Sequence, residues 1–239
     1  MEKKDALICH TRGLSGYKVF LDFDNTLTSF DVLDDIIERF SSNKDWMRFE
    51  NLWKSGKIGS QECLENQLKS VKISKARLKK YLSGIRIAPS ARKFLKLLAE
   101  NRVKLVILSD SFSFIIRSIL NGNGVNGIKI YSNRLRFVRD RLIPSFPHTD
   151  GRCLRCGHCK NKHLIIPSLK DKIIVYIGDG LSDICPARNA DVVFAKADLL
   201  GYFRKNKIPC IAFNDFRQVY GYFRRLINAT ERKNKKAAG

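Results

Sequence analysis

Short apolar runs rich in β-branched residues alternate with helical periodicities along most of this chain, and that alternation limits the folds open to it. The runs are Tyr17–Leu21, Val103–Leu108, Lys172–Ile177, Asp191–Phe194 and Ile208–Ala212. Each has the pattern of a strand buried on both faces, which is typical of parallel sheets. The helical patterns between them are Ala91–Ala99, Phe112–Leu120, Ser182–Ala190, Ala197–Lys205 and Phe216–Ile227. This order predicts an α/β fold with a doubly wound parallel sheet.

One segment interrupts the alternation, because residues 30–85 carry only helical patterns. An apolar stripe at helical spacing begins at Val32, and Ser60 and Ser74 are the expected N-caps of later helices. An all-helical insert directly after the first strand predicts a cap over the carboxyl edge of the sheet. We therefore expect three parts: a Rossmann-like core at residues 1–29 and 86–227, a small helical cap at residues 30–85, and a basic, frayed tail at residues 228–239.

The composition is that of a globular protein, with 44% hydrophobic and 28% charged residues among 239. No stretch reaches the about 20 apolar residues of a membrane helix, and the N-terminus lacks the apolar run of a signal peptide. We expect a cytoplasmic protein with no membrane association. The 45 Lys and Arg residues against 23 Asp and Glu give a formal charge of +22, which attracts anions. Phosphorylated metabolites and nucleic acid both qualify as partners.

Two carboxylates, Asp22 and Asp24, directly follow the first predicted strand. Ligands of open α/β sheets bind outside the carboxyl ends of the strands. Two acids this close repel each other unless a cation lies between them, and Mg²⁺ prefers such oxygen ligands. The alternative is a solvated turn that caps the following helix.

Three further signals fall near the ends of other predicted strands. Ser109 and Asp110 follow the second run at an expected helix start, where a hydroxyl and backbone amides can hold phosphate oxygens. Asp179 and Asp183 lie in a glycine-containing turn after the third run, and Lys160 lies shortly before that run. Taken together, these residues predict one site for a metal ion and a phosphate group.

The motifs, in this order, resemble those of haloacid dehalogenase-type phosphatases: DFDNT, a serine after the next strand, a lysine, and GDGLSD. The helical insert is similar to the small cap of the subclass that includes phosphoserine phosphatase. Three stretches resemble the branch of the methionine-salvage phosphatase acting on 2-hydroxy-3-keto-5-methylthiopentenyl 1-phosphate: CLRCGHCK, VYIGDGLSDICPA and DVVFAK. Phosphocholine and phosphoethanolamine phosphatases are relatives of that branch. The resemblance covers roughly residues 17–216.

This resemblance implies a Mg²⁺-dependent phosphomonoesterase that acts on a small phosphorylated metabolite. Asp22 would be the nucleophile that forms an aspartyl-phosphate, and Asp24 would be the general acid and base. The residues implied to bind the phosphoryl oxygens are Ser109, Asp110 and Lys160. The implied metal ligands are Asp22, Asp24, Asp179 and Asp183. Where the family commonly has glycine, this chain has Asn25, and asparagine tolerates unusual backbone angles.

Three thiols recur at a spacing of three residues: Cys153, Cys156 and Cys159. With His148, His158 and His163 nearby, they could form a tetrahedral Zn²⁺ site that rigidifies the loop presenting the lysine. Reduced structural thiols are the alternative, since the odd number of cysteines and the missing signal sequence argue against disulfides.

Two other functions compete with the metabolite phosphatase. A phosphatase acting on nucleotides or polynucleotide ends would keep Asp22 and also use the basic surface. A basic nucleic-acid-binding protein with a zinc cluster and no catalysis would explain the charge and the cysteines. Such a binder has no need for four acids at strand ends, because acids without a metal ion repel phosphates.

Overall fold

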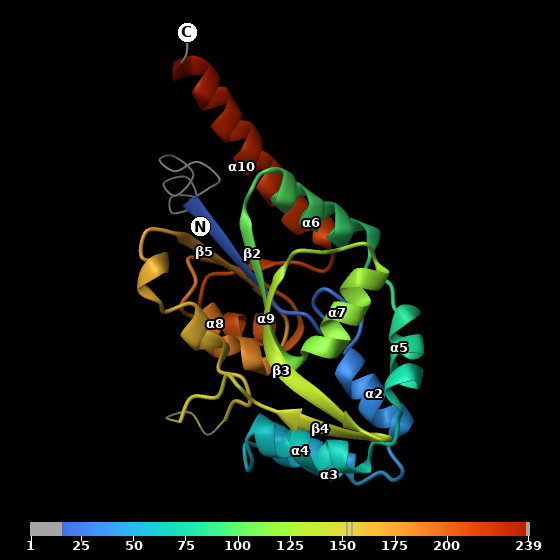
Figure 1. Ribbon diagram of the computed structural model, residues 1–239. Coiled ribbons are helices and arrows are strands. Elements are labelled where there is room, and N and C mark those ends of the chain that lie inside the picture. The colour runs from blue at the N-terminus through green and yellow to red at the C-terminus, as the bar shows by residue number, and fades with distance from the viewer. Residues whose placement is uncertain (1–15, 152, 154, 238–239) are drawn as a thin grey trace. The chain divides into compact units, whose positions relative to one another are not determined.

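The computed structural model describes residues 16–151, 153 and 155–237 (Figure 1). Residues 1–15 of the predicted core and 238–239 of the predicted tail lie outside this part. The chain divides into two compact units. The first combines Met1–Leu21, Ala88–Val106 and Leu164–Gly239, and the second combines Asp22–Ile87 and Ile107–His163. The predicted division into core, cap and tail stays a prediction.

The strands form one seven-stranded sheet in the order β4-β3-β2-β1-β5-β6-β7. Their bounds are β1 Tyr17–Leu21, β2 Lys104–Phe112, β3 Lys129–Val138, β4 Arg141–Ser145, β5 Ile173–Gly178, β6 Val192–Ala195 and β7 Ile211–Ala212. The pairs β1·β5, β5·β6 and β6·β7 are parallel, whereas β3 and β4 form an antiparallel hairpin. The predicted α/β class with a mostly parallel sheet is confirmed.

In the first unit, the central strands are buried because nearly every residue is apolar. All residues of β5 and β6 are buried, as expected for strands covered on both faces. The β1·β5 register pairs Leu21 with Ile177, so the two strands end at the same level. The helices are α6 Pro89–Glu100, α8 Ile184–Ala187, α9 Ala197–Lys205 and α10 Phe216–Ala237. Figure 1 shows α6 alongside α10, where Phe94 packs against Phe216 and Phe223.

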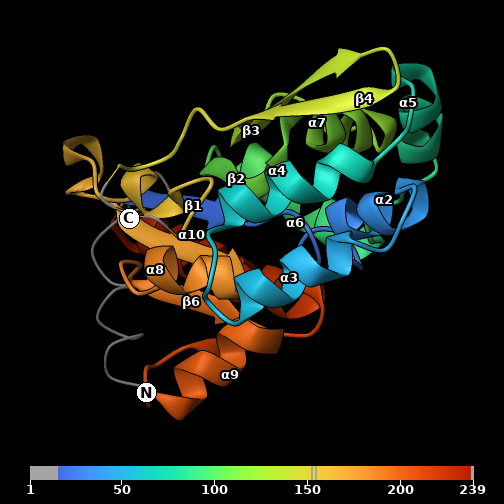
Figure 2. The same ribbon diagram turned by 90° about the horizontal axis from the view of Figure 1, so that it is seen from below.

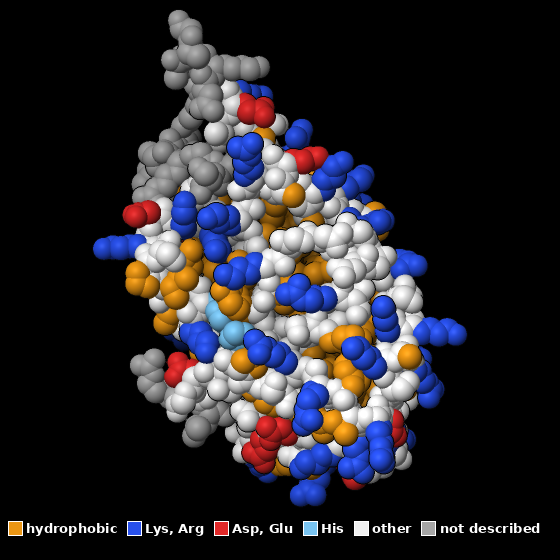
Figure 3. All heavy atoms as spheres, viewed as in Figure 1, with side chains coloured by type: hydrophobic (Ala, Val, Ile, Leu, Met, Phe, Trp, Pro, Cys, Tyr) orange, Lys and Arg blue, Asp and Glu red, His pale blue; other side chains and the backbone are white. Residues whose placement is uncertain are grey.

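The second unit contains α2 Val32–Phe40, α3 Trp46–Lys54, α4 Ser60–Ser70, α5 Lys75–Ser83, α7 Ser113–Gly122 and the β3–β4 hairpin. Both α4 and α7 pack on one side of that hairpin (Figure 2). Phe137 and Leu142 are opposite each other on the packed side. The other side is exposed and carries Arg134, Arg136 and Arg141. Among the charged side chains on the face seen in Figure 3, Lys and Arg predominate over Asp and Glu.

Several boundaries differ from the prediction. β2 continues through Ser109 to Phe112, so Ser109 lies in the strand and not at a helix start. The strands β3 and β4 lie outside the five apolar runs named from the sequence. α10 continues past Ile227 to Ala237, so the tail predicted to be frayed is largely helical. The helix predicted at Ser182–Ala190 is reduced to the 3₁₀ turn η4 Leu181–Asp183 and the short α8.

The two predicted N-caps also have different outcomes. Ser74 caps α5, since its side chain accepts a hydrogen bond from the Arg77 amide. Ser60 is instead the first residue of α4, and its hydroxyl accepts a hydrogen bond from the Gly157 amide at 2.7 Å. The prediction for Ser60 was therefore wrong, because a segment distant in the sequence takes its side chain. Within the described residues, no helix is both long and apolar enough to cross a membrane.

Candidate active site

Asp22 and Lys160 form a buried ion pair in the second unit. Asp22 follows β1 directly, and Lys160 opens the 3₁₀ turn η2 Lys160–His163. The lysine Nζ lies 2.6 Å from Asp22 Oδ1, and the two residues are only 3% and 6% exposed. A buried charge requires a partner of opposite sign, and each of these residues supplies it for the other. The structure thus brings together the predicted nucleophile and one predicted phosphate-binding cation.

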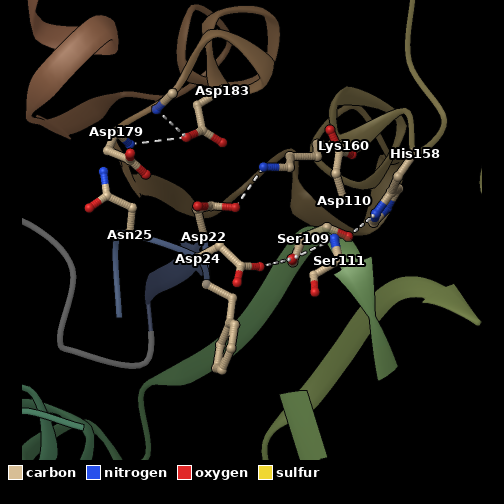
Figure 4. A network of polar contacts seen from close by, with 12 residues as sticks. Asp22, Asp24, Asn25, Ser109, Asp110, Ser111, His158, Lys160, Asp179 and Asp183 are labelled. Atoms are coloured by element: carbon tan, nitrogen blue, oxygen red, sulfur yellow. Dashed lines mark hydrogen bonds and ion pairs between the residues drawn. The ribbon is translucent and has the colours of Figure 1, made fainter. Parts of the chain in front are cut away.

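Asp24 and Ser109 meet beside this pair (Figure 4). Asp24 Oδ1 accepts a hydrogen bond from the Val32 amide at the start of α2, and Oδ2 accepts one from Ser109 Oγ at 3.4 Å. Burial, followed by the neighbouring carboxylate of Asp31, raises the pKa of Asp24 well above its ordinary value. The Asp24 carboxyl therefore favours its protonated form, which is the form that a general acid needs.

The loop after β1 is held by its own hydrogen bonds. Asn25 has φ +49°, the left-handed conformation that favours glycine. Its amide donates to Thr28 Oγ1 and to the Phe30 carbonyl. Thr28 Oγ1 in turn donates to the carbonyls of Phe23 and Phe30. Asparagine tolerates this backbone angle, so it can stand where the family commonly has glycine. The loop fixes where the carboxylate of Asp24 points.

The end of β2 is fixed by side chains from other segments. Ser109 is 1% exposed, and its hydroxyl accepts a hydrogen bond from the Ser111 amide. The Asp110 carbonyl accepts one from Asn133 Nδ2 on β3 at 2.7 Å. The Ser109 carbonyl lies 2.9 Å from Nδ1 of the buried His158. Sequence reasoning treated His158 only as a possible metal neighbour and missed this contact, because a single histidine in a loop gives no signal of its partner.

Asp179 and Asp183 lie in the first unit, in the turn after β5. Both are buried. Asp183 Oδ1 accepts a hydrogen bond from the Tyr176 hydroxyl at 2.6 Å, while Oδ2 accepts from the amides of Asp179 and Gly180. Figure 4 shows these two contacts to the backbone. Asp183 therefore shapes the turn that presents the Asp179 carboxylate.

The cysteine loop, of which residues 153 and 155–159 are described, contacts the start of α4 through Arg155 and Gly157, both of which are hydrogen-bonded to Ser60. Gly157 fits there because a Cβ atom would lie 3.0 to 3.2 Å from Phe146 and Gln61. The thiols of Cys153, Cys156 and Cys159 are free. Among the described residues, these thiols form no group of three ligand atoms close enough for one metal ion. The prediction of a zinc site therefore gains no support.

The fold is similar to that of solved phosphoserine phosphatases. Phosphoserine phosphatase from T. onnurineus matches with a TM-score of 0.65 at 17% identity, covering 91% of this chain and 98% of that one. A phospho-aspartyl intermediate analogue of phosphoserine phosphatase matches with a TM-score of 0.64 at 21% identity, covering 86% and 99%. At these identities the two structures establish the fold alone.

Residues 17–207 match the protein family described as "Putative Phosphatase", and the chain belongs to this family. It is 26% identical over 214 residues to 2-hydroxy-3-keto-5-methylthiopentenyl-1-phosphate phosphatase of Bacillus cereus. The aligned region covers 88% of this chain and 97% of that protein. The protein of the same name from Bacillus thuringiensis is 25% identical over the same shares. The resemblance predicted from the motifs is confirmed, and the chain is a phosphoric monoester hydrolase. The alternative of a nucleic-acid binder without catalysis was wrong.

Proposed function

We propose that this phosphatase is Mg²⁺-dependent and hydrolyses a small phosphorylated metabolite through an aspartyl-phosphate on Asp22. The buried ion pair between Asp22 and Lys160 carries this proposal. In this pair, the carboxylate that would act as the nucleophile contacts a cation that could neutralise phosphoryl oxygens. Ser109 and Asp24 contact each other beside it. Phosphoryl transfer needs little beyond such positioning and charge neutralisation.

The proposed ligands of Mg²⁺ are Asp22, the backbone carbonyl of Asp24, and Asp179, with Asp183 supporting them. The β1·β5 register supports this set, because Leu21 and Ile177 are paired and the acids follow both strands at the same edge. Buried carboxylates are the oxygen donors that a hard cation prefers. When bound, Mg²⁺ would neutralise charge on the phosphoryl group. Since both oxygens of Asp183 already accept hydrogen bonds, its main role would be to orient the turn.

In the first chemical step, an Asp22 oxygen attacks phosphorus and the bond from phosphorus to the substrate oxygen breaks. The Asp24 carboxyl gives its proton to that departing oxygen, which leaves as an alcohol. Lys160 and Ser109 would hold the phosphoryl oxygens during transfer. Asp110 would contribute through the backbone that presents Ser109, which Asn133 fixes.

In the second step, water attacks the phosphorus of the aspartyl-phosphate. Asp24 takes the proton of the water, the bond between Asp22 and phosphorus breaks, and inorganic phosphate leaves. The fold match to a phospho-aspartyl intermediate analogue of phosphoserine phosphatase supports this two-step route.

The relatives from Bacillus are named for 2-hydroxy-3-keto-5-methylthiopentenyl-1-phosphate, which supports a small phosphorylated metabolite as the substrate class here. A nucleotide or a polynucleotide end remains the competing substrate. Nucleic-acid partners and a cytoplasmic location also remain predictions. A panel of phosphorylated metabolites and nucleotides, assayed for phosphate release, distinguishes the two substrate classes.

The mechanism is tested with Asp22→Asn and with p-nitrophenyl phosphate as the substrate. We expect this variant to lose at least about 10³-fold in kcat, since the amide cannot attack phosphorus. Asp140→Asn is the matched control, because Asp140 is exposed at the tip of the β3–β4 hairpin. EDTA should abolish wild-type activity and added Mg²⁺ should restore it. Full activity of Asp22→Asn, or full activity in EDTA, would contradict the proposal.

A further inference from the structure

His158 is a buried residue of the cysteine loop that contacts one proposed phosphate-binding residue and lies two positions before the other. It is 1% exposed. Its Nδ1 lies 2.9 Å from the Ser109 carbonyl. A dashed line marks this contact in Figure 4. Its own carbonyl accepts a hydrogen bond from the Lys160 amide at 2.9 Å. One histidine is thus bonded, through its ring and through its backbone, to both residues.

The contacts of the ring determine where its proton lies. The Ser109 carbonyl can only accept, so Nδ1 must carry the hydrogen. The other nitrogen, Nε2, lies 2.9 Å from Nε2 of His163. In a neutral ring with its proton on Nδ1, Nε2 is an acceptor, and His163 therefore donates to it. A charged His158 would direct a second N–H at the donor of His163, so this geometry suits the neutral ring.

His163 is itself held by stacking. Its ring lies 4.1 Å from that of Tyr131 on β3, with an angle of 19° between the planes. The groups that face His158 are the Ser109 carbonyl, His163, His148 and the Lys160 ammonium. All three charged or titratable neighbours would repel a proton on the ring. Burial adds to this effect and is the main reason that the pKa of His158 is lowered to about 3.

The geometry points to His158 as a positioning residue that fixes Ser109 and Lys160 relative to each other, so that both can hold one phosphoryl group. This inference rests on the proposed function, in which these two residues bind the phosphoryl oxygens. Ser109 Oγ reaches Asp24, and Lys160 Nζ reaches Asp22. Catalytic donors have to keep a fixed separation, and a displacement of about 1 Å can cost orders of magnitude in rate.

The two ring nitrogens can be tested separately by amide variants. In His158→Asn, the side-chain Nδ2 takes the place of ring Nδ1 and can still donate to the Ser109 carbonyl. In His158→Gln, the amide lies near the place of ring Nε2, so it can contact His163 but not Ser109. His158→Ala removes both contacts. Each variant is assayed with p-nitrophenyl phosphate and Mg²⁺, and the Kd of inorganic phosphate is measured by calorimetry.

For a positioning role, His158→Gln and His158→Ala should each raise the KM and the phosphate Kd about tenfold or more. His158→Asn should stay within about threefold of the wild type. Equal losses in the Asn and Gln variants, or losses that follow thermal stability alone, overturn the inference. Unchanged phosphate affinity in His158→Ala also overturns it. If the wild type hydrolyses no phosphomonoester, the proposed function fails, whereas the phosphate affinities still decide the role of His158.

Discussion

A Cβ atom at Gly178, the last residue of β5, would lie 2.5 Å from Asp183 Oδ2 in the turn that follows and 3.0 Å from the Tyr176 ring on the same strand. A Cβ atom at Gly180 would meet nothing within 4 Å. Gly180 also has φ −104°, which any residue adopts. An added methyl group would therefore clash with Asp183 at Gly178 but would meet no neighbour at Gly180.

Gly178→Ala should displace the Asp183 carboxylate and weaken the turn that it holds. We expect the free energy of unfolding to fall by about 1–3 kcal/mol, as for overpacking of a dense site. The Mg²⁺ concentration needed for half-maximal phosphatase activity should rise as well. Urea unfolding and a Mg²⁺ titration measure the two effects.

Gly180→Ala is the matched control for this prediction. It adds the same methyl group two residues away and should change the free energy of unfolding by less than about 0.5 kcal/mol. Equal effects of the two substitutions would show that Asp183 does not hold the turn as described.

At the scale of elements, Ser60 and Ser74 both lie at the start of a helix but have different roles: Ser74 caps its own helix, whereas Ser60 contacts a distant loop. Ser74→Ala removes an N-cap of α5 and should cost about 1 kcal/mol with no change in KM. Ser60→Ala leaves the buried Gly157 amide without its acceptor, which should cost about 1–3 kcal/mol. Because Gly157 belongs to the loop that presents Lys160, the KM should rise in the Ser60 variant. Thermal unfolding and steady-state kinetics of both variants test this, and identical KM values would contradict it.

The sequence predicted those elements whose signal is local. β1 and α9 have the predicted bounds, because an apolar run or a helical period ends there against polar residues. β2 was predicted too short, since Ser109 and Ser111 are polar although they are buried in the strand. Local patterns do not show that a neighbouring strand continues to pair with such residues.

The residues of the candidate site were predictable where their signal is local, and their contacts with distant segments were not. Asp22, Asp24 and Asp179 each come shortly after an apolar strand, so a position near the end of a strand could be inferred for each of them from the sequence. The contacts of Ser60 with Gly157 and of His158 with Ser109 join segments 97 and 49 residues apart. No periodicity encodes such pairs, because they depend on how the loops pack once the fold has formed.

For the whole molecule, the formal charge of +22 affects both the attraction of the substrate and the pH dependence of the free energy of unfolding. A positive field attracts phosphate dianions and raises their local concentration. The same field opposes the addition of protons to the folded chain, so it acts in the same direction as burial on the imidazoles. The two influences differ in range, because salt screens surface charge over about 8 Å at physiological ionic strength but affects buried groups less.

Because salt screens surface charge more than buried groups, the effect of net charge on stability can be told apart from the effect of the buried histidines. Burial lowers the pKa of His158 to about 3 and is the largest cause that lowers the pKa of His163 to about 4, both from 6.5. Below pH 6.5 the unfolded chain therefore binds protons that the folded chain does not. The contribution of the two histidines to the free energy of unfolding should be constant above about pH 7 and should fall as the pH drops from 6.5 towards 4. The raised pKa values of Asp24 and Asp34 contribute with the opposite sign, because the folded chain keeps protons there that the unfolded chain releases. His158 alone contributes up to about 1.4 kcal/mol per pH unit, and the partly exposed His163 contributes less.

Urea unfolding between pH 4 and 8, at low salt and in 0.5 M NaCl, separates the buried imidazoles from the surface charge. Self-repulsion of the basic surface weakens when salt screens it, whereas the desolvation of a buried ring does not change. The difference in slope between the wild type and His158→Asn below pH 6.5 isolates this imidazole from the titrating carboxyls, and it should persist in high salt. A difference that vanishes in salt would assign it to net charge, and the buried imidazole of His158 would then have no part in the acid sensitivity.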